Sequence, residues 1–346
     1  MTEGGSADRV LSGSTQPLSQ LYDVGLLDLD GVVYVGPHAV PGAAEALAAA
    51  RASGMRLAFV TNNASRDPAT VAAHLVELGI PASPEDVVTS SQAAATVIVE
   101  RLGPGASVLV TGSAALRSAV ETAGLRPVTS ADDGPDAVVQ GFAPELCYAD
   151  LAEAALAVRA GALWVATNVD STLPSARGLL PGNGSLVGMV AIATGQRPVV
   201  AGKPELPLHA EGVRRAAATH PLVIGDRLDT DIEGAHAAAA DSLLVLTGVA
   251  TAADLVNAPA RHRPTYLAFD LRGLLEPHPE VERHGTVAHC GGWRAVLLPV
   301  DGALRVMLDG GGTSLDGLRA VLAAAWSAEP GGSVDGSSAL ALLGLA

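Results

Sequence analysis

The sequence has little positive charge. Its 346 residues include 21 lysines and arginines against 36 aspartates and glutamates, which gives a formal net charge of -15. Nucleic acids and anionic lipid surfaces gain nothing from a field of their own sign. The charge balance therefore argues against sequence-independent binding to either, and we expect no nucleic-acid partner and no membrane partner.

Cysteines and long apolar runs are also scarce. The two cysteines, Cys147 and Cys290, lie far apart and do not have the spacing of a metal-binding or redox pair. Sparse cysteine is typical of a reducing compartment. The first twenty residues lack the basic and apolar regions of a signal peptide, and no apolar run approaches the roughly 20 residues of a membrane span. We therefore predict a cytoplasmic protein with a loose tail over residues 1–20.

Lysine is the scarcest charged residue. The chain has 20 arginines but a single lysine, Lys203 in VVAGKPELPL. Few aromatic residues and abundant alanine indicate a GC-rich coding bias, which explains the arginines but not this exception. Arginine is a planar fork, whereas lysine is a compact, rotatable point charge on a thin stem. Lys203 is therefore a candidate functional residue. The alternative is a surface lysine before a helix that starts with proline.

What the sequence does contain is an alternation of short buried strands and helices. Over residues 21–82 this pattern predicts a parallel sheet. One expected helix, RDPATVAAHLVELG, has Asp67 as N-cap, Pro68 at its first position and Gly79 past its end. Residues 83–181 repeat the alternation and could bury a core of their own, so we expect an inserted α/β domain.

The first pattern resumes over residues 182–276 with buried strands and crossover helices. Residues 277–346 differ, with three expected antiparallel strands, a hairpin turn at Asp301 and Gly302, and one helix. The stretch EPGGSVDGSSA has the composition of a flexible segment. The predicted fold class is α/β, with a doubly wound parallel-sheet core, an inserted α/β domain and a small appended α+β module.

Polar residues follow the ends of four expected strands. They are Asp28 and Asp30 in DLDG, Thr61 and Asn62 in VTNN, Lys203 in GKPE, and Asp226 in GDRLDTDI. In an open parallel sheet, ligands bind in the crevice outside the carboxyl ends of the strands. If these strands are neighbours, their end residues converge into a single site.

The two acids of DLDG have a spacing that allows them to divide catalytic work. Because successive side chains of a strand alternate, Asp28 and Asp30 emerge on the same side, and Gly31 lets the backbone approach a ligand closely. One carboxylate can act as a nucleophile while the other serves as general acid and base. The alternative is a pair of acids that cap the following turn.

Asp226 would add a third carboxylate to this edge of the sheet. Asp229 and Asp231 follow it at the start of a helix, where carboxylates are ordinary caps. Three carboxylates in one crevice are unfavourable unless a hard cation lies among them. Mg²⁺ fits such a place because it takes oxygen ligands and keeps several waters. We therefore predict a magnesium site.

A phosphoryl group needs hydrogen-bond donors and positive charge, in contrast to the acids. They would come from the Thr61 hydroxyl, the backbone N–H groups near Asn62 and the Lys203 ammonium. A phosphate that approaches a carboxylate meets a repulsion of roughly 4 kcal/mol per charge pair at near-contact distance and intermediate dielectric. We expect Lys203 and the cation to overcome this repulsion. A slim ammonium reaches one oxygen beside a metal, where a guanidinium would be too wide and too rigid.

The motifs DLDG, VTNN, GKPE and GDRLDTDI, in this order and spacing, resemble the four motifs of the haloacid dehalogenase superfamily. The resemblance covers about residues 22–276. The large insert is similar to that of the subfamily of 4-nitrophenylphosphatases, phosphoglycolate phosphatases and glycerol-phosphate phosphatases. Residues 277–346 lie outside the resemblance. We expect them to shield a sheet edge, with a regulatory or acyltransferase-like remnant as the alternatives.

The resemblance implies a role for each acid. Asp28 would attack phosphorus and form an aspartyl phosphate. Asp30 would protonate the leaving alcohol and then activate the water that hydrolyses the intermediate. Mg²⁺ would be held by the Asp28 carboxylate, the Asp30 backbone carbonyl and Asp226, with Asp231 in support.

The resemblance also implies that Thr61, the backbone near Asn62, and Lys203 hold the phosphoryl oxygens under a cap that chooses the leaving group. We predict a magnesium-dependent phosphatase of a small phosphorylated metabolite, with glycerol 3-phosphate first and phosphoglycolate, a sugar phosphate or pyridoxal phosphate as alternatives. A phosphotransferase and a phosphometabolite-binding or sensing protein are the other classes. Intact Asp28 and Asp30 argue against a binding protein. A homodimer is left open.

Overall fold

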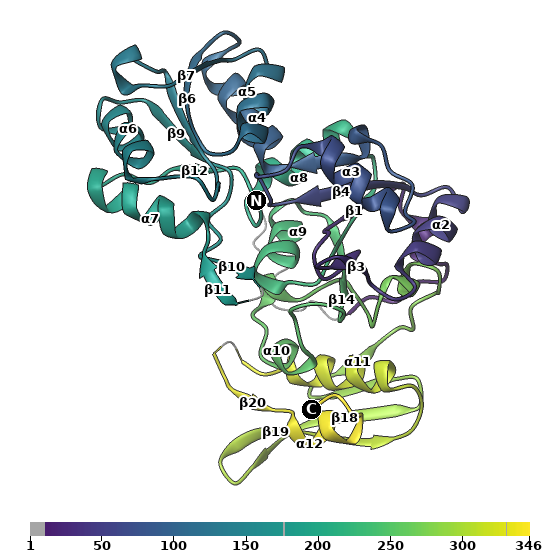
Figure 1. The fold of residues 1–346 in the computed structure, drawn as a ribbon. Coiled ribbons are helices and arrows are strands. Elements are labelled where there is room, and N and C mark those ends of the chain that lie inside the picture. Colours follow the sequence, from purple (N-terminus) through teal and green to yellow (C-terminus); the bar gives the residue numbers. More distant parts are fainter. Residues whose placement is uncertain (1–10, 176, 330) are drawn as a thin grey trace. The chain divides into compact units, whose positions relative to one another are not determined.

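The computed structural model describes residues 11–175, 177–329 and 331–346, which form two compact units (Figure 1). Unit 1 contains the chain up to Leu57 together with Ala218–Ala346, and unit 2 contains Ala58–Ala217. The division falls inside strand β4 (Arg56–Thr61), which begins in unit 1 and ends in unit 2. The α/β class expected from the sequence is confirmed.

Unit 1 contains a parallel sheet in which the strands follow the order β15-β14-β13-β1. These strands are β1 (Val24–Leu27), β13 (Pro221–Gly225), β14 (Asp241–Val245) and β15 (Tyr266–Ala268). The helices of this part are α1 (Leu18–Leu21), α2 (Ala43–Ala52), α9 (Glu233–Ala237) and α10 (Ala252–Val256), and β2 (Tyr34–Val35) pairs with β3 (His38–Ala39). The strands are buried along nearly their whole length, as parallel strands covered on both faces are. Their carboxyl ends therefore form one edge of the sheet.

The appended module of unit 1 is a second, mostly antiparallel sheet. Its elements are β16 (Glu282–His284), β17 (Val287–Cys290), β18 (Trp293–Val300), β19 (Ala303–Gly310), α11 (Ser314–Ala325), β20 (Val334–Asp335) and α12 (Ser337–Leu342). Asp301 and Gly302 both have positive φ and form the expected hairpin turn between β18 and β19. Leu318 and Leu322 of α11 belong to the same apolar cluster as Leu244 and Leu267 of the core sheet. The module therefore shares its hydrophobic core with the main sheet.

The outer edge of β15 is covered by two segments. The N–H of Leu246 donates to the carbonyl of Ala268, so the carbonyls of Thr265 and Leu267 face away from β14. Ser12 N–H donates to Thr265 O (2.8 Å), and Arg319 Nη2 of α11 donates to Leu267 O (2.8 Å). An uncovered edge is a template for pairing with another chain. Arg319 of the C-terminal module thus covers part of the β15 edge, in agreement with the expectation that this module shields a sheet edge.

Two segments that we expected to be loose are ordered. Leu11 and Leu18 are buried, so residues 11–20 are part of the packed unit, whereas residues 1–10 lie outside the described chain. In EPGGSVDGSSA, Val334 starts strand β20, and its N–H and C=O pair with the Asn257 amide at 2.9 and 3.1 Å. Composition alone could not reveal Asn257 as a partner, because it lies far away in the sequence. Pro330, at the start of the stretch, lies outside the described residues.

Unit 2 contains a five-stranded parallel sheet with the order β12-β9-β8-β6-β7, and strand β4 pairs in parallel with β5. The strands are β5 (Val87–Thr89), β6 (Ser107–Thr111), β7 (Arg126–Val128), β8 (Ala137–Gln140), β9 (Leu163–Ala166), β12 (Val199–Val200), and the hairpin of β10 (Thr172–Ser175) with β11 (Gly178–Pro181). The helices are α3 (Pro68–Glu77), α4 (Ser90–Leu102), α5 (Ala114–Thr122), α6 (Tyr148–Arg159), α7 (Asn183–Thr194) and α8 (Leu206–Arg215). The predicted limits of α3 are confirmed, because Asp67 accepts a hydrogen bond from Thr70 N–H and Gly79 has φ +82°.

The inserted domain contains more of the chain than we expected, because helix α7 and strand β12 also belong to it. Helix α7 packs against α6, and Val187 and Val190 belong to the same apolar cluster as Leu151. Strand β12 pairs with β9 through Val199 and Val165. The assignment of residues 183–200 to the core pattern of 182–276 was therefore wrong. An apolar helix followed by two valines is typical of any crossover unit, so the pattern could not show which sheet it joins.

The remaining general expectations concern cysteines and membrane spans. Cys147 is exposed and Cys290 is buried, and neither forms a disulfide. Burial raises the pKa of the Cys290 thiol to about 11, which keeps it protonated and unreactive. Among the described residues, every helix is too short or too polar to span a bilayer.

Candidate active site

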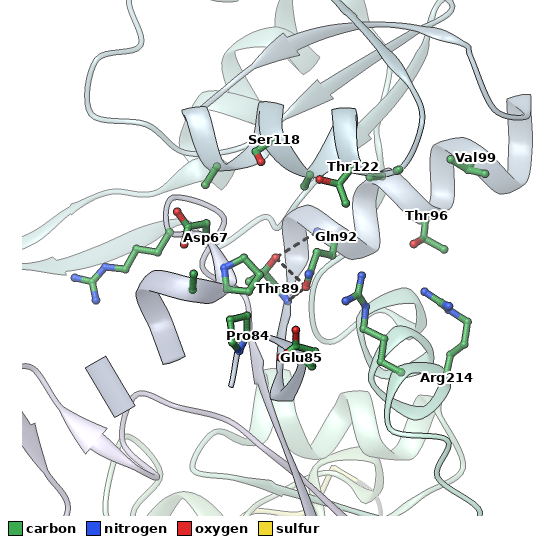
Figure 2. A pocket seen from close by; sticks show the side chains of 18 of the residues that line it. Asp67, Pro84, Glu85, Thr89, Gln92, Thr96, Val99, Ser118, Thr122 and Arg214 are labelled. Atoms are coloured by element: carbon green, nitrogen blue, oxygen red, sulfur yellow. Dashed lines mark hydrogen bonds between the residues drawn. The ribbon is translucent and has the colours of Figure 1, made fainter. Parts of the chain in front are cut away.

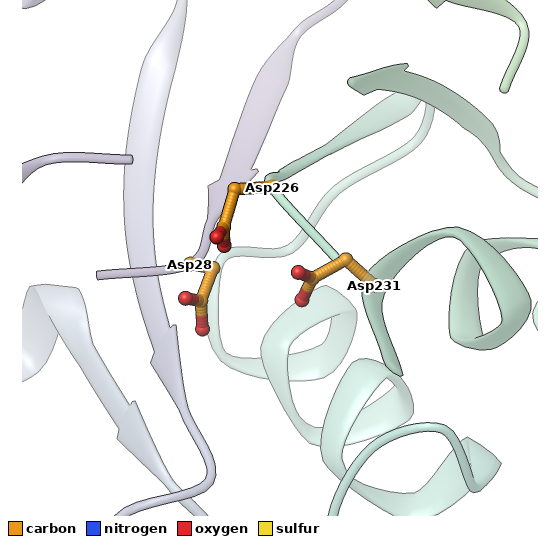
Figure 3. A group of neighbouring side chains, drawn as sticks. All are labelled: Asp28, Asp226 and Asp231. Carbon is orange, nitrogen blue, oxygen red and sulfur yellow. The ribbon is translucent and has the colours of Figure 1, made fainter. Parts of the chain in front are cut away.

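Three aspartates of unit 1 come together at the carboxyl ends of β1 and β13 (Figure 3). Asp28 follows β1, Asp226 follows β13, and Asp231 lies in the π-helix of residues 228–232. One carboxylate oxygen from each lies within 4.8 Å of the other two, and Asp226 and Asp231 are each only 1% exposed. Carboxylates held this close repel one another unless a cation lies among them. Their hard oxygen atoms fit Mg²⁺.

The cluster agrees with only part of the predicted ligand set. Asp28 and Asp226 are brought together as we expected, and Asp231, for which we expected only a supporting role, has an equal place in the group. The Asp30 carboxylate is not a member of this group, and its side chain is exposed. The expected contribution of Asp30 to the metal is its backbone carbonyl, and this stays a prediction.

Glycines determine how closely the backbone approaches these acids. A Cβ placed on Gly225 would lie 2.2 Å from the Cβ of Asp231, and a Cβ on Gly31 would lie 2.4 Å from Asp226 Oδ2. Gly31 also has φ +84°, a conformation that other residues rarely adopt. The role predicted for Gly31, close approach of the backbone, is consistent with its contact with Asp226. The acids therefore lie in spaces that any side chain at these positions would fill.

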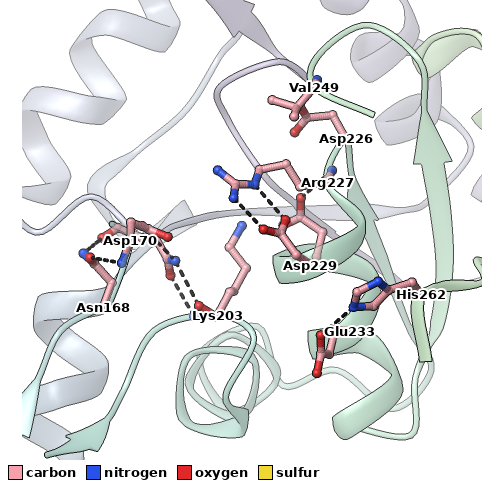
Figure 4. A network of polar contacts seen from close by, with 11 residues as sticks. Asn168, Asp170, Lys203, Asp226, Arg227, Asp229, Glu233, Val249 and His262 are labelled. Carbon is pink, nitrogen blue, oxygen red and sulfur yellow. Dashed lines mark hydrogen bonds and ion pairs between the residues drawn. The ribbon is translucent and has the colours of Figure 1, made fainter. Parts of the chain in front are cut away.

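The structure distinguishes Asp229 from Asp231, which the sequence could not do. Asp229 is exposed and accepts two hydrogen bonds from Arg227, Nε to Oδ1 at 3.0 Å and Nη2 to Oδ2 at 2.8 Å (Figure 4). These hydrogen bonds hold the pKa of Asp229 below its usual value. Asp231 is buried and accepts from the backbone N–H of Arg227 at 3.1 Å. Asp229 therefore serves an ion pair, while Asp231 belongs to the acidic cluster.

In unit 2, Lys203 is a buried residue. Its relative exposure is 4%, and its Nζ donates to the carbonyl of Val60 at 3.3 Å. The alternative of a solvated surface lysine is therefore wrong. An ammonium is costly to bury. Its burial supports the interpretation that the only lysine of the chain is functional.

The side chain of Asn62 holds the backbone of Lys203 at two points. Lys203 N–H donates to Asn62 Oδ1 at 2.7 Å, and Asn62 Nδ2 donates to Lys203 O at 3.1 Å. The same Nδ2 lies 3.3 Å from Asp170 Oδ2, and Asn168 Nδ2 donates to Asn62 O at 2.8 Å (Figure 4). The sequence assigned no role to Asn168 and Asp170, because Asn-Val-Asp is ordinary turn chemistry. Asn62 was expected to act through its backbone, and the use of its side chain was missed.

Thr61 and Gly202 are the chain neighbours of Asn62 and Lys203. Thr61 ends β4, is 5% exposed and accepts a hydrogen bond from Asn63 N–H at 3.1 Å. A hydroxyl that accepts one bond still has its own proton to donate. A Cβ on Gly202 would lie 2.6 Å from Asn62 Oδ1, so the amide needs glycine beside it.

The predicted site residues thus fall into two groups. The acids, with Gly31, belong to unit 1, and Thr61, Asn62 and Lys203 belong to unit 2. In unit 1, Asp28 and Asp226 lie together, and in unit 2, Asn62 and Lys203 are joined by hydrogen bonds. That the two groups serve one ligand stays a prediction.

A separate pocket of about 750 Å³ lies in unit 2 (Figure 2). Helices α3, α4, α5 and α8 line it, and Gln92, Thr122 and Arg214 are among its side chains. None of the residues that line it was predicted to belong to the site. Its charges are of both signs, so they favour no particular class of ligand.

Comparisons with known proteins identify the family. Residues 25–126 match the family of haloacid dehalogenase-like hydrolases, and residues 200–274 match a second HAD-hydrolase-like family model. A D-glycerol 3-phosphate phosphatase of Mycobacterium tuberculosis is 50% identical over 318 residues, which are 90% of this chain and 88% of that protein. An acid sugar phosphatase of Staphylococcus aureus is 38% identical over 252 residues, 72% of this chain and 95% of that protein. This chain belongs to the haloacid dehalogenase-like hydrolase family.

A solved structure extends the likeness to nearly the whole chain. The glycerol phosphate phosphatase of Mycobacterium tuberculosis in complex with magnesium has a TM-score of 0.86 and 47% sequence identity, and the match covers 96% of this chain and 100% of that chain. The predicted class, a phosphatase of the haloacid dehalogenase superfamily, is confirmed, as is the fold class.

Proposed function

We propose that this phosphatase uses Mg²⁺ to hydrolyse glycerol 3-phosphate through an aspartyl phosphate on Asp28. The observation that carries the proposal is the group of three aspartates, of which Asp226 and Asp231 are buried and Asp28 is half-buried. It occurs in a chain that is 50% identical to a D-glycerol 3-phosphate phosphatase. Enzymes of phosphate-monoester hydrolysis accelerate one of the slowest reactions known, so several catalytic devices must act together.

The metal would be held by the carboxylates of Asp28, Asp226 and Asp231 and by the Asp30 carbonyl. The donor set fits, because hard oxygen atoms of three acids lie within 4.8 Å of one another. When bound, the ion withdraws electron density from the phosphoryl oxygens and neutralises charge that develops on them.

Asp28 and Asp30 would carry the covalent chemistry. The Asp28 carboxylate attacks phosphorus, the bond to the leaving oxygen breaks, and protonated Asp30 gives its proton to that oxygen. Asp30, now a carboxylate, takes a proton from the water that attacks the aspartyl phosphate, which releases inorganic phosphate and restores both acids. The exposed Asp30 side chain is accessible to a leaving alcohol and to water.

Lys203, Thr61 and the backbone beside Asn62 would hold the phosphoryl oxygens. Lys203 provides a buried positive charge, and the Asn62 amide fixes its backbone. Charge-assisted hydrogen bonds of this kind are about twice as strong as neutral ones.

A small soluble metabolite is the substrate class that this family membership favours, and we infer a cytoplasmic location for the enzyme. Both cysteines of the chain are free, in agreement with a reducing compartment. A sugar phosphate is the second candidate substrate, because an acid sugar phosphatase is 38% identical to this chain. Greater identity over a greater share of the chain favours glycerol 3-phosphate.

The test is a comparison of kcat/KM for glycerol 3-phosphate, sugar phosphates, phosphoglycolate and pyridoxal phosphate, with Mg²⁺ present and phosphate release as the readout. We expect glycerol 3-phosphate to give the highest value. A tenfold higher value for a sugar phosphate would overturn the proposed substrate. Transfer of phosphate to added glycerol in preference to water would instead identify a phosphotransferase.

A further inference from the structure

The loop between β14 and α10, residues 246–251, contacts both motif loops of the acidic cluster. Val249 N–H donates to Asp226 Oδ2 at 2.7 Å, and Ala250 N–H donates to Asp226 O at 3.0 Å (Figure 4). Thr247 Oγ1 donates to the Gly31 carbonyl at 2.5 Å. These residues lie outside the four sequence motifs. The loop therefore joins the segment after Asp28 to the segment after β13.

Gly248 brings this loop against the Asp226 carboxylate. A Cβ on Gly248 would lie 2.0 Å from Asp226 Oδ2 and 2.5 Å from its Cγ, closer than non-bonded atoms can approach. A Cβ on Gly31 would lie 2.4 Å from the same oxygen and 3.1 Å from the Cα of Gly248. The Asp226 carboxylate thus lies between two glycine backbones, and one of its oxygens accepts a hydrogen bond from a backbone N–H.

We propose that Thr247, Gly248 and the Val249 N–H form a positioning segment that orients Asp226 for the metal. The Val249 N–H fixes the rotation of the carboxylate, and the two glycines leave space for only that orientation. The hydrogen bond from the Thr247 hydroxyl to the Gly31 carbonyl holds the Gly31 backbone against the Asp226 carboxylate. This inference rests on the proposed metal site. Groups that orient metal ligands in this way typically change metal affinity by about 10- to 100-fold when they are lost.

Four substitutions separate the parts of this segment. Gly248→Ala places a methyl group where the carboxylate lies, and Thr247→Val removes the hydroxyl while keeping the shape of the side chain. Thr247→Ser restores the hydroxyl. Val249→Ala is the matched control, because the contact of Val249 with Asp226 uses the backbone N–H and its side chain is 65% exposed.

The experiment measures Mg²⁺ binding to the metal-stripped full-length protein by isothermal titration calorimetry, without substrate. We expect Gly248→Ala to weaken binding at least ~10-fold and Thr247→Val to weaken it several-fold. Thr247→Ser and Val249→Ala should remain within about twofold of the wild type. Thermal unfolding in EDTA, where no metal contributes, shows which variants are folded.

The outcomes distinguish this inference from the proposed function. If Asp226→Asn binds Mg²⁺ as tightly as the wild type, the proposed metal site is wrong. If Asp226→Asn loses binding while Gly248→Ala and Thr247→Val retain it, the metal site stands and the positioning segment is wrong. Should Gly248→Ala fail to fold, the comparison of Thr247→Val with Thr247→Ser decides alone: equal affinities overturn the inference, and rescue by serine supports it.

Discussion

The proposed site has two groups of residues, an acidic half in unit 1 and a Lys203 half in unit 2, and each is held in place by different means. In unit 1, Asp226 and Asp231 are enclosed by glycine backbones that approach to distances no side chain would permit. In unit 2, Lys203 is held by the amide of Asn62, which pairs with its N–H and its C=O. Acids that repel one another need a rigid enclosure, because they separate if the backbone yields. A single buried cation can instead be placed by polar partners.

The first way to test this comparison is to remove the reacting atom of the acidic half. Asp28→Asn should lower kcat by at least ~10³-fold, because an amide is not a competent nucleophile. Since the change keeps the shape of the side chain and removes one of three carboxylate charges that repel one another without metal, the unfolding temperature in EDTA should be unchanged or higher. Steady-state phosphate release measures the effect. Retention of more than a small fraction of turnover would show that another residue attacks phosphorus.

The second test exchanges the cation of the other half. Lys203→Arg keeps the charge but adds a planar fork in a buried space, so we expect it to be nearly as damaging as Lys203→Ala, with ~10²-fold losses in kcat/KM. Kinetic assays of both variants at saturating Mg²⁺ provide the comparison. Wild-type rates in the arginine variant would contradict the argument that size selects lysine.

The third test loosens the placement of Lys203 without touching its charge. Asn62→Ala removes both contacts with the Lys203 backbone, and we expect kcat/KM to fall ~10-fold or more, because small misplacements of catalytic groups are costly. The adjacent Asn63 is the matched control, since its Oδ1 accepts only within its own turn, from Ser65. Asn63→Ala should stay close to the wild type. Equal losses of kcat/KM in the two variants would mean that any change in this loop lowers activity, and would contradict a specific role of Asn62 in placing Lys203.

The fourth test compares an enclosing glycine with an ordinary one. Gly225→Ala should lower the free energy of unfolding by ~1–3 kcal/mol, because its Cβ would overlap Asp231. Gly188 lies within helix α7, and a Cβ there meets no atom within 4 Å. Gly188→Ala should therefore leave stability unchanged or raise it by up to ~1 kcal/mol. Urea unfolding in EDTA measures both, and equal effects would remove the distinction.

The smallest effect is expected from acid acting on His278, which belongs to neither group of predicted site residues. Burial lowers the pKa of His278, the nearby positive charge of Arg319 adds to this, and a hydrogen bond to Gly273 O opposes it. Since the pKa is lower in the folded protein, the stability that His278 contributes is complete above its ordinary pKa of about 6.5 and is lost as the pH falls through the folded value. Urea unfolding between about pH 7 and 5 should show a smaller pH dependence for His278→Gln than for the wild type.

Sequence alone predicted the residues with distinctive chemistry at strand ends. Asp28 and Asp226 follow short apolar runs, and Lys203 is conspicuous because no other lysine exists in the chain. Residue type and position at a strand end, with the rule that ligands bind at the carboxyl ends of parallel strands, therefore predicted two of the three clustered acids. Asp231 was undervalued, because an acid at a helix start looks the same whether it caps the helix or faces a neighbouring strand.

What the sequence missed depends on backbone contacts and distant partners. Val249 contacts Asp226 through an N–H that every residue except proline has, so its identity carries no signal. The pairing of Asn257 with Val334 joins positions that no local pattern connects. Likewise, Asn168 meets Asn62 only because two separate strands end near each other.

The helix α11 has a consequence for how the protein is made. Its residues from Gly317 to Ala325 are all buried, and Arg319 among them binds the outer edge of β15. A ribosome releases the catalytic strands before this helix, so the Leu267 carbonyl at this edge has no Arg319 partner until the helix is made. We expect chains that stop before Ser314 to aggregate or be degraded.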